Sequence, residues 1–255
     1  RDVAMSCGGD TVSLAGGWEY EVFADFGKLP RKPVSPSGSS FPTVLYNAMV
    51  CPIVTMPVKG VLWYQGCSNV GRAEQYSPLF RRLISDWREM RHSPDMPFYF
   101  VQLSGWAALR QAQADALELD NTAMAVTIDI GDSADIHPKN KQEVARRLSL
   151  IALKRSYGVG GVVDTAPVPV SCRYAGGGAE LEFDGNIVVD GSRPQGFIVK
   201  TAAGQWVVPA VTVAGKRTLR LSADGGIEAV RYNWADYPLG NLRGETGLPV
   251  AQFAR

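Results

Sequence analysis

The chain has 255 residues, enough to bury a sizeable core in one large domain or two smaller ones. Its 26 lysines and arginines and its 25 aspartates and glutamates leave a formal net charge of +1, so the sequence provides no electrostatic case for binding nucleic acid or an anionic membrane. The longest apolar run, residues 58–64, is far too short to span a bilayer. We therefore expect a soluble globular protein with neither of these partners.

The cysteines do not indicate a metal site. Cys7, Cys51, Cys67 and Cys172 show no C-x-x-C spacing and do not cluster with either of the two histidines, which argues against structural zinc. Nothing else in the sequence implies a cofactor, and we expect none.

Residues 1–41 predict a lead-in segment of strand and loop. Residues 10–23 alternate enough to form a strand with a Gly-Gly bend, whereas residues 28–40 are rich in proline and serine and predict an extended surface loop. The chain opens at Arg1 without an initiator methionine or a signal pattern, so we interpret it as cut or processed from a longer chain.

Residues 42–160 alternate between helical and strand-like patterns. Residues 43–56 predict a helix interrupted near Pro52. In residues 72–90, apolar side chains recur every three or four positions, which predicts one buried helical face. The members of this face are Tyr76, Leu79, Phe80, Leu83, Ile84 and Trp87.

Three apolar runs in the same region predict fully buried strands, and two further segments predict helices. The strands are residues 59–65, 97–103 and 122–130. The helices are residues 106–119 and 138–157, the second with a proline at its first position, where a missing N–H costs nothing. Strands and helices in alternation are typical of a parallel sheet covered by helices on both faces.

Residues 161–255 change to short strands separated by glycine and aspartate turns. This spacing predicts an antiparallel β-sandwich of roughly 90 residues. The expected fold class is therefore α/β, with a parallel sheet and flanking helices in residues 42–160, followed by the small antiparallel β-sandwich.

Ligands of open parallel sheets bind at the carboxyl ends of the strands, and three polar segments follow the predicted strands there: residues 65–69, 102–104 and 129–138. In the last segment, Asp135 lies two positions before His137. A histidine that accepts a proton needs a carboxylate to fix its tautomer and to stabilise the imidazolium. The alternative is that His137 caps the next helix and Asp135 is a turn residue, because D-x-H is too short a pattern to choose between them.

Gln65, Gly66 and Asn69 predict an oxyanion hole after the first strand. The glycine lets its backbone N–H approach a developing alkoxide, and a side-chain amide offers a second donor. The alternative is a tight turn in which the amides satisfy the loop itself.

Other reactive side chains are weaker candidates. Cys67 as a nucleophile would need a histidine within hydrogen-bond reach, and nothing near it in the sequence lowers its pKa. Ser68 is weaker still. We expect His92 to be a surface residue, and Asp129 and Asp132 to be turn formers rather than catalysts.

These segments resemble the sialate O-acetylesterases of the SGNH (GDSL-like) hydrolase superfamily. The resemblance runs over almost the whole chain and includes KGVLWYQGCSNVGRAEQY, DIHPKNKQEVARRL and VRYNWADYPLGNLRGETGLPVAQF. It implies a partial SGNH-type parallel sheet and a carbohydrate esterase that removes O-acetyl groups from sialic acid by Ser-His-Asp catalysis. His137 matches the catalytic histidine and Asp135 its acidic partner. Gln65, Gly66 and Asn69 match the block that lines the oxyanion hole.

Two features depart from the family pattern. The family's nucleophilic serine lies in an upstream G-Q-S-N-M type block, which residues 1–41 do not contain, and the family usually has glutamate at the position of Cys67. We therefore expect a C-terminal portion that lacks the serine and the first strand and has little activity alone. Its own N-terminal fragment or a homo-oligomer partner would cover the free strand edge. The family is commonly exported, which predicts a periplasmic, secreted or lysosome-like location.

A non-catalytic carbohydrate-binding or scaffold module is the alternative. Trp206, Tyr232, Trp234 and Tyr237 of the β-sandwich could stack on sugar rings. Because these aromatic residues fall within strand patterns, packing in the core or between domains is the competing interpretation.

Overall fold

The computed structural model describes residues 4–13, 17, 38 and 41–255. The chain forms two compact units, Arg1–Ile53 and Val54–Arg255. The predicted functional residues all lie in the second unit.

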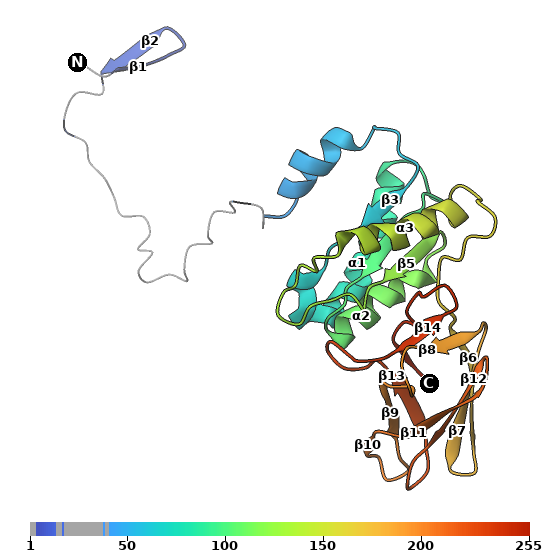
Figure 1. The fold of residues 1–255 in the computed structure, drawn as a ribbon. Helices are drawn as coiled ribbons and strands as arrows, with labels where there is room; N and C mark the ends of the chain where they lie inside the picture. Colours follow the sequence, from blue (N-terminus) through green and yellow to red (C-terminus); the bar gives the residue numbers. More distant parts are fainter. Residues whose placement is uncertain (1–3, 14–16, 18–37, 39–40) are drawn as a thin grey trace. The chain divides into compact units, whose positions relative to one another are not determined.

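The first unit contains a β-hairpin and two short helical elements. Strands β1 (Ala4–Cys7) and β2 (Asp10–Ser13) pair antiparallel across a two-glycine turn (Figure 1). The helical elements are the π-helix η1 (Tyr46–Val50) and the 3-10 helix η2 (Cys51–Ile53). The predicted strand at residues 10–23 is confirmed over its first four residues. The rest of that strand and the loop at 28–40 lie outside the described residues, apart from Gly17 and Gly38.

The second unit begins with a three-stranded parallel sheet in the order β3-β4-β5, as the alternating pattern predicts. Its strands are β3 (Val61–Trp63), β4 (Phe98–Gln102) and β5 (Thr122–Val126). The polar segments that follow these strands therefore share one end of the sheet.

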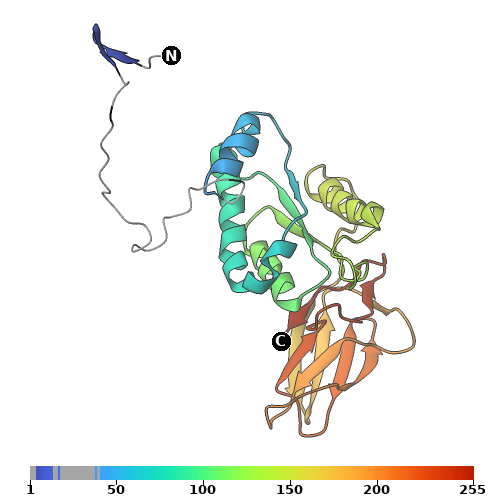
Figure 2. The same cartoon turned by 90° about the vertical axis from the view of Figure 1, so that its left-hand side faces the viewer.

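Helices cover both faces of this sheet. They are α1 (Ala73–Met90), which follows the 3-10 helix η3 (Cys67–Arg72); α2 (Ala107–Ala114), continued by the 3-10 helix η4 (Asp115–Glu118); and α3 (Lys141–Arg155). Phe98 and Phe100 of β4 pack with α1 and α2, whereas Tyr99 and Val101 pack with α3. Figure 2 shows α3 on the opposite side of the sheet from α1 and α2. The predicted two-sided cover is confirmed.

The prediction that β3 is fully buried is wrong. Leu62 is 59% exposed, because β3 stands at the edge of the described sheet and pairs only with β4. An edge strand presents unpaired backbone groups on its outer side. The expected free edge is therefore present in this part of the chain.

Two details of the predicted helices also need correction. Leu79, assigned to the buried face of α1, is 56% exposed, whereas Ser77 and Arg88 are buried. Helix α3 begins at Lys141 rather than at the proline, because the side chain of Asn140 accepts a hydrogen bond from the backbone N–H of Glu143 and caps the helix.

The remainder of the second unit is an antiparallel sandwich. Its two sheets have the orders β10-β9-β13-β15 and β11-β12-β7-β6, with a separate pair β14-β8. The strands are β6 (Pro169–Ala175), β7 (Gly178–Phe183), β8 (Ile187–Val189), β9 (Phe197–Lys200), β10 (Trp206–Val207), β11 (Ala210–Gly215), β12 (Thr218–Ser222), β13 (Ala229–Tyr232), β14 (Leu242–Gly244) and β15 (Phe253–Ala254). The predicted sandwich is confirmed.

Arg110 of α2 joins the sheet domain to the sandwich. Its side chain is fully buried, and its Nε donates to Oε1 of Gln252 at 2.9 Å. Its two terminal nitrogens donate to the backbone carbonyls of Ser104, Gly105, Asn233 and Ala235. Burial lowers the pKa of Arg110 to about 10, against an opposing effect of Asp236, so the guanidinium stays charged at neutral pH.

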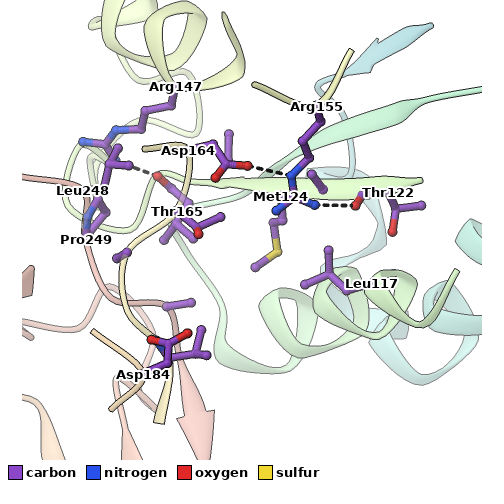
Figure 3. A pocket seen from close by; sticks show the side chains of 16 residues that line it. Leu117, Thr122, Met124, Arg147, Arg155, Asp164, Thr165, Asp184, Leu248 and Pro249 are labelled. Atoms are coloured by element: carbon purple, nitrogen blue, oxygen red, sulfur yellow. Dashed lines mark hydrogen bonds and ion pairs between the residues drawn. The ribbon is translucent and has the colours of Figure 1, made fainter. Parts of the chain in front are cut away.

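Two arginines of α3 cover the outer edge of β5. Arg147 donates to the carbonyl of Val126, and Arg155 donates to the carbonyl of Thr122. A cavity of about 370 Å³ lies beside this edge. Figure 3 shows Arg155 on its wall, reaching both Thr122 and Asp164. Arg155 and Asp164 on the wall of this cavity are thus paired with each other.

Candidate active site

Gly66 begins the polar loop at the carboxyl end of β3. Its φ of 149° is one that side-chain-bearing residues rarely adopt. A Cβ atom there would lie 3.1 Å from Cδ1 of Leu103 and 3.3 Å from the hydroxyl oxygen of Tyr76. Only glycine fits this position, and its buried backbone turns the chain into η3.

Buried side chains of α1 and α2 contact the loop that follows β3. Oε1 of Gln113 accepts from the backbone N–H of Leu103 at 2.9 Å, and its Nε2 donates to the carbonyl of Gln65 at 3.4 Å. The hydroxyl of Tyr76 lies 3.5 Å from the same carbonyl. Gln113 was not predicted as a supporting residue. The feature that could have indicated it is a glutamine among the apolar positions of a helix.

Asp135 and His137 lie together, as the D-x-H pattern suggested. Oδ1 of Asp135 accepts from the backbone N–H of His137 at 2.8 Å and lies 3.5 Å from its Nδ1. The carboxylate thus shapes the local turn and faces the nitrogen that must be held if Nε2 is to accept a proton. Both side chains are open to solvent, with 79% of His137 and 46% of Asp135 exposed.

A cavity of about 360 Å³ brings the two predicted halves of the site together. It is lined by Tyr64, Gln65, Gly66, Cys67, Ser68, Leu103, Ile136, His137 and Lys141. His137 therefore shares one cavity with two of the predicted oxyanion residues, although 71 or more positions separate them in the chain. A volume of this size suits a small ligand.

Asn69 and Asp135 are not among the residues that line the cavity. The backbone N–H of Asn69 donates to the carbonyl of Gly66 at 2.8 Å, which closes the turn after β3. This backbone hydrogen bond agrees with the turn interpretation. Tyr64 and Lys141, which do line the cavity, were not identified from the sequence.

Cys67 and Ser68 line the cavity, but neither forms a hydrogen bond with the imidazole in the described part of the chain. Burial raises the pKa of the Cys67 thiol, and a backbone hydrogen bond and the charge of Lys141 only partly oppose this. Within the described part of the chain, no hydroxyl or thiol hydrogen-bonds to the His137 side chain. A thiol that holds its proton is a poor nucleophile.

His92, Asp129 and Asp132 lie outside the cavity. His92 is exposed, as expected, in the connection between α1 and β4. Asp132 is a turn former, since its Oδ1 accepts from the backbone N–H of Ala134. The same prediction for Asp129 is incomplete, because Asp129 also forms ion pairs with two arginines of other elements.

The aromatic residues considered for sugar stacking have partners within the protein. The guanidinium carbon of Arg231 lies 4.2 Å from the ring centroid of Trp206 and 4.8 Å from that of Trp234. Tyr232 is fully buried, and Tyr237 packs edge-on against Trp106. These contacts agree with the packing interpretation.

No group of three or more histidine, cysteine, aspartate or glutamate side chains in the described residues is arranged to hold a metal ion. The groups that line the cavity are an imidazole, an ammonium group, amide donors, a thiol and two hydroxyls, and the Asp135 carboxylate lies beside the imidazole.

Comparison with known proteins places the chain in a family. A sequence profile described as carbohydrate esterase, sialic acid-specific acetylesterase, matches residues 33–151. The sialate O-acetylesterase of Mus musculus is 32% identical to this chain over 241 residues, and that of Homo sapiens is 31% identical to it over 248 residues. The chain belongs to the sialic acid-specific acetylesterase family. The matched profile includes the Gln65–Gly66 loop and the Asp135–His137 turn.

The match covers most of this chain but only part of the relatives. It spans 80% and 83% of the chain, and 44% and 47% of the mouse and human proteins, so the chain spans a little under half the length of these acetylesterases. A crystal structure of a carbohydrate acetylesterase from Xanthomonas citri is similar with a TM-score of 0.79 and 36% identity, over 84% of this chain and 54% of that one. The family and fold expected from the sequence are confirmed.

Proposed function

We propose that this chain supplies the histidine, its acidic partner and the oxyanion wall of a carbohydrate esterase that removes O-acetyl groups from sialic acid. The observation that carries the proposal is the cavity at the carboxyl end of β3, which both His137 and Gly66 line. Membership of the acetylesterase family supports the reaction class.

In the proposed reaction, the nucleophile is a serine from an upstream part of the protein. Its Oγ attacks the acetyl carbonyl carbon, and Nε2 of His137 takes the serine proton while Asp135 holds Nδ1. The oxyanion accepts hydrogen bonds from the Gly66 N–H and from Gln65 or Asn69. The proton then passes to the departing sugar oxygen, and water hydrolyses the acetyl-serine to acetate.

The free edge of β3 would receive the strand that carries this serine. Leu62 is exposed there, and an unpaired edge is an aggregation hazard unless another strand covers it. The covering strand would come from the protein's own N-terminal fragment or from a homo-oligomer partner. The proposed division of the chain is a lead-in segment (1–41), the C-terminal part of an SGNH hydrolase domain (42–160) and a β-sandwich domain (161–255).

The test compares the chain alone with a longer protein that includes the upstream part, using an O-acetylated sialic acid as substrate. We expect trace activity from the chain alone and full activity from the longer protein. In the longer protein, His137→Ala should lower kcat/KM at least about a thousandfold, whereas His92→Ala, which changes an exposed histidine outside the cavity, should not. Robust turnover by the chain alone, lost with His137→Ala, would contradict the serine assignment and point to Cys67 or Ser68.

We also propose that the whole protein is exported, because sialate O-acetylesterases commonly are. No helix among the described residues is long and apolar enough to cross a membrane. Fractionation of the native cells into cytosolic and exported protein tests the location, and finding the protein only in the cytosol would contradict it.

A further inference from the structure

Lys141 is the one lysine or arginine side chain that lines the candidate active-site cavity, and no carboxylate lines it. The other lining groups are uncharged side chains, the imidazole of His137 and the Gly66 backbone. The Nζ atom of Lys141 donates to the hydroxyl oxygen of Tyr64 at 3.2 Å and lies 4.7 Å from the centroid of its ring. The ammonium group is therefore held at the cavity wall by a neutral partner.

The other cations of α3 are used differently. Arg146 and Arg147 pair with Glu143, and Lys154 and Arg155 pair with Asp164. In the described part of the chain, Lys141 alone among the cations of this helix pairs with no acidic side chain.

The position of Lys141 is also not explained by helix stability. Lys141 occupies the first turn of α3, where the helix dipole favours acidic side chains and disfavours cations. An ammonium group without a counter-ion, beside an aromatic ring and in a cavity, is suited to receive an anion from the ligand.

We propose that Lys141, steadied by Tyr64, binds the carboxylate of an acidic O-acetylated sugar while the acetyl ester lies between His137 and Gly66. This inference rests on the proposed function and deepens it. Sialic acid carries one carboxylate, remote from the ester that reacts, and a neutral acetylated sugar carries none. The site therefore prefers acidic acetylated sugars over neutral ones.

The binding of the carboxylate affects substrate affinity rather than bond breaking. The carboxylate is present in the ground state and in the transition state alike, so losing its partner raises KM and leaves kcat nearly unchanged. A hydrogen bond between charged groups corresponds to about ten- to a hundredfold in affinity.

The experiment uses the longer protein and three substrates: an O-acetylated sialic acid, the methyl ester of the same sugar, and 4-nitrophenyl acetate. For Lys141→Met we expect KM for the acid to rise about ten- to a hundredfold, with kcat within about twofold. Turnover of the neutral methyl ester and of 4-nitrophenyl acetate should stay within about twofold. Tyr64→Phe should give a smaller rise for the acid alone, and Lys141→Arg should retain most of the preference.

Lys139→Met is the matched control, because Lys139 is exposed, is two residues from Lys141 and does not line the cavity. It removes the same charge and should leave all three substrates unaffected. An equal effect of Lys141→Met on the acid and its methyl ester, or no effect on either, would overturn the inference while leaving the esterase intact. Failure of the unmodified longer protein to hydrolyse any of the three would overturn the proposed function, and this inference with it.

Discussion

Asp132 and Asp135 occupy the same loop and form the same local turn. Each accepts, through Oδ1, a hydrogen bond of 2.8 Å from the backbone N–H two residues later. Only Asp135 also faces an imidazole, at 3.5 Å from Nδ1 of His137. The pair of aspartates therefore separates the contribution of the turn from the contribution of the charge beside the histidine.

Replacing Asp135 by asparagine should impair catalysis without unfolding the loop. Asparagine keeps the oxygen that accepts from the backbone, but it removes the charge that stabilises the imidazolium. In the longer protein, we expect Asp135→Asn to lower kcat at least about a hundredfold and to leave the melting temperature unchanged. Steady-state kinetics and thermal melts measure both quantities.

Asp132→Asn is the control, since it changes the same kind of turn away from the imidazole. Its kcat should match that of the unmodified protein. If the two variants have the same kcat, Asp135 is a turn residue only.

Among the elements, α3 carries two adjacent arginines with different surroundings. Arg146 is half exposed and pairs with Glu143 alone. Arg147 is 5% exposed, pairs with Glu143 and Asp129, and donates to the carbonyl of Val126 at the edge of β5. Hydrogen bonds from these arginines hold the pKa of Glu143 at about 2, with Arg146 as the largest cause and burial opposing it.

Replacing Arg147 should destabilise the sheet domain far more than replacing Arg146. Arg147→Met leaves the largely buried carboxylate of Asp129 with one partner fewer and removes the hydrogen bond to the carbonyl of Val126 at the edge of β5. We therefore expect a loss of about 3–5 kcal/mol in the free energy of unfolding. Arg146→Met breaks an exposed pair and should cost less than about 1 kcal/mol. Denaturant unfolding measures both, and equal losses would contradict the edge-capping role of Arg147.

Across the whole molecule, Asp129 connects three elements. It lies after β5, and its carboxylate pairs with Arg147 of α3 and with Arg243 of β14 in the sandwich. Burial would raise the pKa of Asp129, but hydrogen bonds and charge from the two arginines outweigh burial and place the pKa below its ordinary value. Together with Arg110, this carboxylate holds the sheet domain and the sandwich as one unit.

The lowered pKa of Asp129 predicts how stability depends on pH. In the unfolded chain the pKa of an aspartate is about 3.9. Because its folded pKa is lower, Asp129 contributes fully above that pH and loses its contribution as the pH falls through the folded value. At pH 7 we expect Asp129→Asn to lower the free energy of unfolding by about 3–5 kcal/mol, and this difference should shrink as the pH falls below about 4.

Asp190→Asn is the control for the same network. Asp190 also pairs with Arg243, but 64% of its side chain is exposed, so its loss should cost less than about 1 kcal/mol at any pH. Unfolding curves recorded between pH 2 and pH 7 give all three stabilities. A difference between Asp129→Asn and the unmodified chain that persists at the lowest pH would contradict the ion-pair explanation.

Much of the fold follows from patterns within short windows of the sequence. Apolar runs placed β4 and β5 correctly, and helical periodicity placed α1. The D-x-H turn is likewise a contact between residues two positions apart. These features depend on backbone preferences and on side-chain spacing, which a linear pattern records.

Contacts between segments that are distant in the chain could not be predicted from local sequence patterns. The exposure of Leu62 depends on which strand stands beside β3, and periodicity carries no information about strand order. Asp129 meets Arg243 across 114 positions, and Lys141 meets Tyr64 across 77. Such pairs form only when the sheet brings its loops to one end, because the interaction depends on a distance in space and not on a spacing in the chain. The sequence thus accounts for the elements and the histidine turn, whereas the cavity that joins His137, Gly66 and Lys141 is a property of the folded chain.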